Sequence, residues 1–426
     1  MKLLFFMLQS DPLFTNDAIV FGLLMLVIAG VFYTSHSPST FWKKFYTIFP
    51  TLMVCYFVPA LLHWPLGLIS SEGSQLYFVA SRYLLPASLI LLCLSIDLKG
   101  VFNLGPKALI MFFSATVGII IGGPIALLVA SYLLPDVLNV SPDELWRGLS
   151  TVAGSWIGGG ANQAAMKEIY EVNDNLFGTM IIVDLLVGNI WLGFLLYGVS
   201  IKDRMDKWLK ADNSAISDLE NKVAEYRASV ERRADTKDLI MIMAVAFGGV
   251  ALSHLGSEVI TPFMERFEPT LKAWNLTSLL SGFFWLVVIA TTFGLAMSFT
   301  RARKLEGVGA SQWGSIFIWI LVTTIGMKMN LGEVIDNIGL FAIGIIWMII
   351  HVVILMITAK IIKAPFFFVA VGSQANIGGA ASAPVVASAF STSLAPVGVL
   401  MAVLGYALGT YGALVCAELM RIAATG

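Results

Sequence analysis

Two glycine-rich stretches inside apolar sequence decide the fold that we expect. Residues 154–163 read GSWIGGGANQ, and residues 372–382 read GSQANIGGAAS. Glycines and side-chain amides are poor material for a continuous membrane helix. Broken backbone at membrane depth also needs protein or a watery cavity around it. Two such interruptions in matching halves of one membrane protein are the best sequence indicator of a transporter's binding site.

Composition places the chain among all-α polytopic membrane proteins. Of its 426 residues, 58% are hydrophobic and only 12% are charged, which is more apolar surface than a soluble domain of this size needs. Apolar segments of spanning length lie near residues 17–34, 46–63, 76–95, 107–134, 176–200, 239–256, 276–299, 312–328, 337–362 and 395–420. The net charge of −1 gives no indication of a nucleic-acid partner.

We expect two membrane repeats joined by a charged linker. The N-terminal repeat covers residues 1–201, with its interrupted segment at about 147–170, and the C-terminal repeat covers residues 239–426, with its interrupted segment at about 366–390. The linker, residues 202–238, holds 18 of the chain's 53 charged residues. Within it, apolar residues recur at the spacing of an amphipathic helix, at Leu219, Val223, Tyr226 and Val230.

The placement of Lys and Arg predicts that the two repeats are inverted. The charged linker and the other Lys/Arg-rich connections should face the cytoplasm of a cell whose inner membrane holds the protein. This pattern works if each glycine-rich segment enters and leaves on the same side. A full crossing would reverse the parity and move the linker. The repeats also share the tripeptide Ile-Gly-Gly, at residues 157–159 and 377–379.

The interrupted segments supply most of the candidate site. Helix ends inside the membrane leave backbone amides and carbonyls without intrahelical partners. The amides favour an anionic group, and the carbonyls favour a cation. We expect the substrate to contact Gly159, Asn162, Gln163, Gln374, Asn376, Gly379 and Ser382. The alternative is close packing of helices through small residues.

Asp184 is the candidate centre of an ion site. It lies about 12 Å into its span at 1.5 Å per residue, where carboxylates usually serve ion or proton pathways. We expect Na⁺ there, or a proton, with Ser155, Asp184, Asn189 and Ser373 as ligands. The alternative is a structural ion pair with a Lys or Arg.

Weaker candidates lie near the span ends or inside apolar spans. Arg82 could attract a carboxylate or extend to the interface, and Lys167 and Glu168 follow the first motif as interfacial residues. A satisfied buried histidine is the preferred interpretation of His351. Motifs for zinc peptidases, nucleotide-binding loops and Cys-x-x-Cys sites do not occur, so we expect neither an enzyme nor a cofactor.

The run GGGANQAAMKE at residues 158–168, followed by Val183 and Asp184, resembles the YjcL-like membrane proteins grouped as domain of unknown function 819. GSQANIGG at residues 372–379 resembles them too. This resemblance covers nearly the whole chain but implies little chemistry. More distantly, the chain is similar to bile-acid:sodium symporters and to sodium-coupled carboxylate or glutamate carriers. That likeness implies crossed discontinuous helices, Na⁺ coupling and an elevator-like core that moves against a scaffold.

We therefore expect a secondary active transporter, a Na⁺-coupled symporter of a small anionic or zwitterionic solute such as a carboxylate, amino acid or small peptide. A monovalent cation/proton antiporter is the first alternative. A passive channel and a non-transporting membrane scaffold are the others. The partners expected are the lipid bilayer and the solute. The oligomeric state stays open, with a homodimer common for this architecture.

Overall fold

The computed structural model describes residues 12–49, 51–96, 101, 104–135, 140–212, 234–273, 277–329, 340–391 and 394–425. These residues form helices and no strand, apart from one isolated parallel bridge between Phe14 and Ile69. The helices in chain order are α2 (Asp17–Ser35), α3 (Thr40–Ile48), α4 (Thr51–His63), α5 (Leu76–Val79), the π-turn η1 (Ala80–Leu84), α6 (Leu85–Leu94), α8 (Pro106–Leu133), α9 (Pro142–Gly158), α10 (Gly160–Ile169), α11 (Asp174–Ser200), α12 (Lys202–Leu209), α14 (Thr236–Glu265), α15 (Glu268–Ala273), η3 (Thr277–Leu280), α16 (Gly282–Ser298), η4 (Arg301–Val308), α17 (Ala310–Gly326), α19 (Phe341–Ile362), α20 (Phe366–Ile377), α21 (Gly379–Phe390) and α22 (Ala395–Thr425).

The expected all-helical membrane protein is confirmed. Seven of the described helices are long and apolar enough to cross a membrane, or up to nine if each of two bent pairs counts as one span. Large apolar side chains point outward from them, including Leu26, Phe194 and Ile361, which are 69%, 63% and 74% exposed. Such surfaces require a lipid solvent, so the protein contacts the bilayer.

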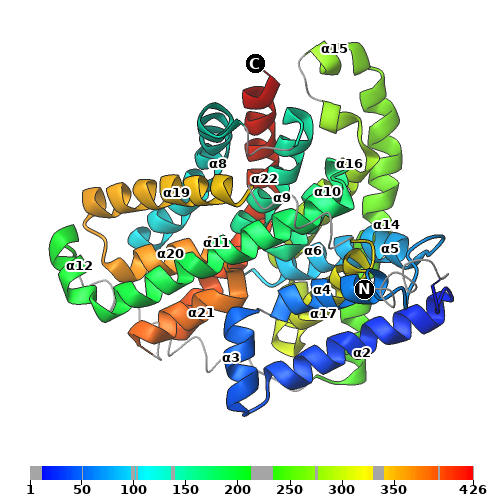
Figure 1. The fold of residues 1–426 in the computed structure, drawn as a ribbon, viewed down its shortest axis with the longest axis horizontal. Helices are drawn as coiled ribbons and strands as arrows, with labels where there is room; N and C mark the ends of the chain where they lie inside the picture. The colour runs from blue at the N-terminus through cyan, green and yellow to red at the C-terminus, as the bar shows by residue number, and fades with distance from the viewer. Residues whose placement is uncertain are drawn as a thin grey trace, which may run out of the picture.

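Helix contacts divide the chain into two groups. The first, which we call the flanking group, comprises α2, α4, α5, η1, α6, α14, α16, η4 and α17. The second, the hairpin group, comprises α8, α9, α10, α11, α19, α20, α21 and α22. In Figure 1 the hairpin group fills the left and centre of the view, and the flanking group lies mainly to the right. Helices α6, α10, α16 and α22 supply most of the contacts between the groups.

The first glycine-rich stretch forms a helical hairpin, hairpin 1, in which α10 folds back along α9. The turn is at Gly159, whose φ of 78° suits glycine. A Cβ atom added to Gly154 would lie 2.6 Å from the carbonyl oxygen of Asn162, eight residues later. In a continuous helix these residues would be about 12 Å apart along the axis. The open ends of the hairpin also meet, because Arg147 Nη1 donates to the Tyr170 carbonyl at 2.9 Å.

The second stretch turns back in the same way and forms hairpin 2. Helix α20 ends at Ile377, and Gly379, with φ of 55°, begins α21. The Gln374 amide donates to the Ser382 hydroxyl across the turn at 2.7 Å. At the open end the Phe367 and Phe390 rings pack with centroids 5.3 Å apart.

The two hairpins enter the hairpin group from opposite ends and meet on α22. Hairpin 1 opens beside the start of α11, whereas the Phe366 amide of hairpin 2 donates to Asp206, just beyond the far end of α11. Helix α11 is about 40 Å long at 1.5 Å per residue. A Cβ atom on Gly405 would lie 2.8 Å from the Ile157 carbonyl oxygen and 3.5 Å from that of Ala375. The C-terminal ends of α9 and α20 therefore converge at Gly405.

Two expectations remain untested by this architecture. The amphipathic helix expected around residues 219–230 of the linker lies outside the described residues. Of the linker, the structure describes α12 and the start of α14. The division into repeats at residues 1–201 and 239–426, and the inversion of those repeats, stay predictions.

Substitution of Gly154 by alanine should destabilise the protein. The added methyl group would press on the Asn162 backbone, and such overpacking costs about 1–3 kcal/mol. Gly193→Ala is the matched control, because nothing lies within 4 Å of a Cβ atom at that helical glycine. Thermal unfolding in detergent should show a lower midpoint for Gly154→Ala and an unchanged or slightly higher one for the control. Equal midpoints for Gly154→Ala and wild type would contradict the hairpin.

Candidate functional site

Asp184 is a buried carboxylate that hairpin 1 surrounds with hydrogen-bond donors. Its side chain lies on α11 and is 4% exposed. Its Oδ2 atom accepts from Ser155 Oγ at 2.6 Å and from Gln163 Nε2 at 3.0 Å, and its Oδ1 atom accepts from Trp156 Nε1 at 2.8 Å. Both arms of the hairpin contribute, so Asp184 fixes the hairpin against α11.

The donors around Asp184 are all neutral. Within the described part of the chain no Lys, Arg or His forms an ion pair with it, so the alternative of a structural ion pair is not what these residues show. Hydrogen bonds stabilise a carboxylate, but they do not neutralise it. Two buried oxygens, Gln163 Oε1 and Tyr56 Oη, also lack hydrogen-bond partners among the described residues. Gln163 holds Asp184 through its nitrogen, so covalent geometry places its free oxygen near the carboxylate.

The asparagines of the two hairpins make the same set of contacts. Asn162 donates to the Gly158 carbonyl at 2.9 Å, and Asn376 donates to the Gly372 carbonyl at 3.0 Å. In each case the acceptor is the glycine four residues earlier. Gly158 is the last residue of α9, so the Asn162 amide satisfies a carbonyl at a helix end, whereas Gly372 lies inside α20 and Asn376 adds a second donor to its carbonyl.

Each asparagine also accepts from a threonine of a neighbouring long helix. Thr410 of α22 donates to Asn162 Oδ1 at 2.6 Å, and Thr116 of α8 donates to Asn376 Oδ1 at 2.8 Å. The contact with α22 is close because Gly409 leaves room for it, since a Cβ atom there would lie 2.4 Å from the Gly158 Cα atom. The two hairpins are thus anchored by one repeated arrangement of asparagine and threonine.

Ser373 belongs to a neutral chain of hydrogen bonds that ties hairpin 2 to α11 and α19. His351 Nδ1 lies 3.1 Å from the Ala115 carbonyl oxygen, which can only accept, so Nδ1 carries the proton. His351 Nε2 then accepts from the Ser373 hydroxyl at 2.8 Å. Ser373 in turn accepts from Trp191 Nε1 at 2.8 Å. His351 is therefore the satisfied buried histidine that we expected.

The structure brings only some of the expected ion ligands together. Ser155 and Asp184 are in direct contact, as is Gln163, which we expected at the substrate. Ser373 is bound to Trp191, which lies seven residues, or about 10.5 Å, along α11 from Asp184. Asn189 is half-buried and makes no hydrogen bond to the described residues. The four expected ligands therefore do not form a single coordination shell in this structure.

The expected substrate residues cluster at the two hairpin turns. Gly159 and Gly379 adopt positive φ there, and Gln374 and Ser382 bridge the second turn. Sequence reasoning gave no role to Trp156, Trp191, Thr116 or Thr410, which hold the hairpins in place. The signal that could have found them is a polar hydrogen-bonding group inside an otherwise apolar span, since such groups need buried partners.

Comparisons with known proteins agree on one family. Residues 22–423 match the family model described as "Protein of unknown function (DUF819)". The chain is 23% identical over 370 residues to a protein of Bacillus subtilis (strain 168) named "Uncharacterized membrane protein YjcL". That alignment covers 83% of this chain and 85% of the relative. No solved structure matches the chain.

Proposed function

The chain belongs to the DUF819 family, whose function is unknown, and we propose that it is a Na⁺-coupled secondary transporter of a small anionic or zwitterionic solute. The solute classes considered are carboxylates, amino acids and small peptides. The observation that carries the proposal is the buried Asp184 carboxylate, which binds hairpin 1 without a counter-ion among the described residues. No catalytic step or cofactor is part of it.

Na⁺ binds at Asp184 in this proposal. A carboxylate removed from water is costly without a compensating charge, and a bound cation supplies it. Hard cations take oxygen ligands, and the unpartnered Gln163 oxygen is available in addition to those of Asp184 and Ser155. The proposal assigns Asn189 and Ser373 to a later point on the ion's path, because Ser373 belongs to hairpin 2.

The solute binds between the hairpin turns. Helices α10 and α21 begin there at Gly160 and Gly379 without a side chain that caps their first amides. Free amides at a helix N-terminus attract anionic groups. Gly379 has open space around its Cα atom, and Gln374 Oε1 is buried without a hydrogen-bond partner in the described chain, so an ammonium group of a zwitterion would find an acceptor.

Alternating access completes the proposal. The two hairpins are the broken helices of two inverted repeats, and the hairpin group moves as an elevator-like core against the flanking group. The protein lies in the inner membrane with residues 202–238 in the cytoplasm. A homodimer is consistent with this arrangement.

Na⁺ should stabilise the wild-type protein specifically. A ligand that binds only the folded state adds about 2.7 kcal/mol at one hundred times its Kd, so the thermal midpoint in Na⁺ should exceed that in K⁺ or choline at equal ionic strength. Asp184→Asn should fold, because Ser155 can reorient and the Gln163 amide can rotate to accept from the new nitrogen. It should lose the Na⁺ effect, because the carboxylate charge is gone. No ion effect in wild type would contradict Na⁺ coupling, and an equal effect in Asp184→Asn would remove the ion from this site.

Solute-coupled flux tests the substrate site. In proteoliposomes, radioactive sodium uptake should rise with one member of a panel of amino acids, small peptides and carboxylates. Asn162→Ala and Asn376→Ala should lower this uptake about tenfold or more, because each removes the buried amide that ties a hairpin to a neighbouring long helix, at about 1–3 kcal/mol. Gln312→Ala, an exposed amide change in α17, is the control.

Three outcomes would each replace the proposal. Sodium efflux driven by a pH gradient without any solute would indicate an antiporter. Ion flux far above transporter turnover would indicate a channel. An absence of flux with every member of the panel would favour a scaffold.

A further inference from the structure

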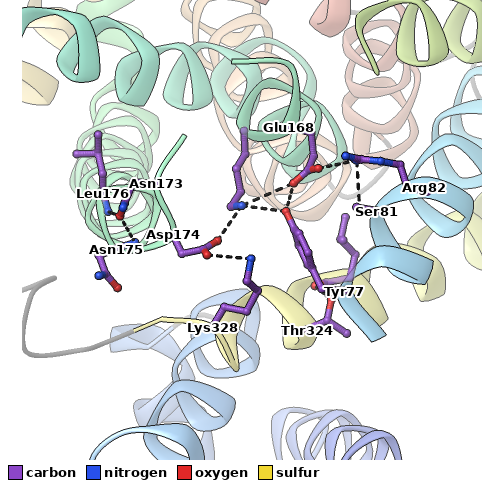
Figure 2. A network of polar contacts seen from close by, with 12 residues as sticks. Tyr77, Ser81, Arg82, Glu168, Asn173, Asp174, Asn175, Leu176, Thr324 and Lys328 are labelled. Carbon is purple, nitrogen blue, oxygen red and sulfur yellow. Dashed lines mark hydrogen bonds and ion pairs between the residues drawn. The ribbon is translucent and has the colours of Figure 1, made fainter. Parts of the chain in front are cut away.

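Six side chains join the hairpin group to the flanking group at the open end of hairpin 1. The flanking group contributes Tyr77 of α5, Arg82 of η1 and Lys328, which follows α17. The hairpin group contributes Lys167 and Glu168 of α10 and Asp174 of α11. Figure 2 shows Tyr77 and Arg82 reaching the Glu168 carboxylate, and Lys328 reaching Asp174. We call these six side chains the bridging network.

Most contacts in the bridging network cross between the groups. Arg82 Nη1 pairs with Glu168 Oε2 at 2.6 Å, and the Tyr77 hydroxyl donates to the other oxygen of the same carboxylate. Lys167 Nζ donates to the Tyr77 hydroxyl at 2.9 Å.

Asp174 carries the second crossing ion pair. It binds Lys328 of the flanking group at 2.9 Å and Lys167 of its own group at 2.8 Å. Among the described residues, the ion pairs that join the two groups both belong to this network, one through Arg82 and one through Lys328.

The network is more buried on the side of the hairpin group than on the side of the flanking group, where the Arg82 and Lys328 side chains are 32% and 30% exposed. The Lys167 and Glu168 side chains are 6% and 9% exposed. The Lys328 and Lys167 ammonium groups lie 4.3 Å and 4.9 Å from the centre of the Tyr77 ring. Cations over aromatic faces gain further attraction, so Tyr77 is held on its hydroxyl and on its ring.

Away from the bridging network the contact between the groups carries no ion pair among the described residues. It is largely apolar, with two neutral hydrogen bonds between α16 and α22, Thr291 to Thr410 at 3.1 Å and Thr292 to Tyr411 at 2.7 Å. Cys93 and Ile96 of the flanking group cluster with Ala407 of α22, and Val403 and Tyr406 pack around them. Apolar contact is not directional and tolerates sliding, whereas charged hydrogen bonds fix geometry. The bridging network is therefore the charged part of this interface.

We propose that the bridging network is an ionic latch, which holds the hairpin group against the flanking group and must open before the hairpin group can move. This inference rests on the proposed alternating access. It predicts that weakening the network raises the population of a displaced state, without Na⁺ or solute. The latch thus controls when the proposed site switches its access from one side of the membrane to the other.

The native cysteines allow a direct test. Cys93 is buried at the interface between the groups, whereas Cys416 is buried inside the hairpin group, where its thiol approaches the Ile119 carbonyl. One background, Cys55→Ala with Cys416→Ala, leaves Cys93 alone. The other, Cys55→Ala with Cys93→Ala, leaves Cys416 alone. Labelling by N-ethylmaleimide is measured in membranes free of Na⁺ and solute.

Glu168→Gln should speed the labelling of Cys93 about tenfold and leave that of Cys416 unchanged. Tenfold corresponds to about 1.4 kcal/mol, less than the usual cost of removing one partner of a buried ion pair. Lys328→Met removes the half-exposed crossing pair and should act in the same direction, so the test survives if Glu168→Gln does not fold. Glu268→Gln, which removes an exposed pair within α15, is the matched control and should change neither rate.

Three results would overturn the latch. Cys93 could be labelled at the wild-type rate in both network variants. Cys93 and Cys416 could be labelled faster together, which would indicate general loosening. The exchange of Arg82→Glu with Glu168→Arg could fail to slow Cys93 labelling relative to Arg82→Glu alone. Because the assay uses neither Na⁺ nor solute, its failure is distinct from a failure of the Na⁺ and flux experiments.

Discussion

A helix that stops inside a membrane leaves backbone carbonyls and amides with no water to satisfy them. Hairpin 1 meets this constraint at Gly158, the last residue of α9, and both hairpins place an asparagine beside the turn. Asn162 and Asn376 bind the carbonyls of Gly158 and Gly372, and a threonine from a neighbouring helix orients each amide. These contacts fix each turn against a neighbouring long helix.

Helix α11 connects the two halves of this arrangement. Asp184 and Trp191 are seven residues apart, so they lie on nearly the same face of the helix. Asp184 binds hairpin 1, and Trp191 binds Ser373 of hairpin 2. An ion at Asp184 would thus act on an element that both hairpins contact, which gives the proposed coupling a physical route. Between the two groups the structure combines an apolar cluster at Cys93 with the ion pairs of Arg82 and Lys328, and in the proposed mechanism it is the ion pairs that must open.

Much of the centre was predictable from the sequence because local patterns encode it. The glycine-rich runs marked both turns, and a lone carboxylate in an apolar span marked Asp184. The partners were not predictable, because they come from distant parts of the chain. Thr410 reaches Asn162 across 248 residues, and Thr116 reaches Asn376 across 260. Arg82 was expected at an interface or a substrate, and Lys167 and Glu168 at an interface. Those positions relative to the membrane stay predictions, and the ion pairs of these residues depend on how α10 lies against the flanking group, which no local pattern specifies.

The central claim is that each glycine-rich segment enters and leaves on one side, and that the two segments do so from opposite sides. Single cysteines at Asp143 and Glu171 flank hairpin 1, and single cysteines at Lys363 and Ala389 flank hairpin 2, all at exposed positions. Labelling with an impermeant maleimide in right-side-out and inside-out vesicles measures their sidedness in a chain without its native cysteines. The account predicts that the first pair reacts from one side and the second pair from the other. Reaction of the two positions of either pair from opposite sides would contradict it.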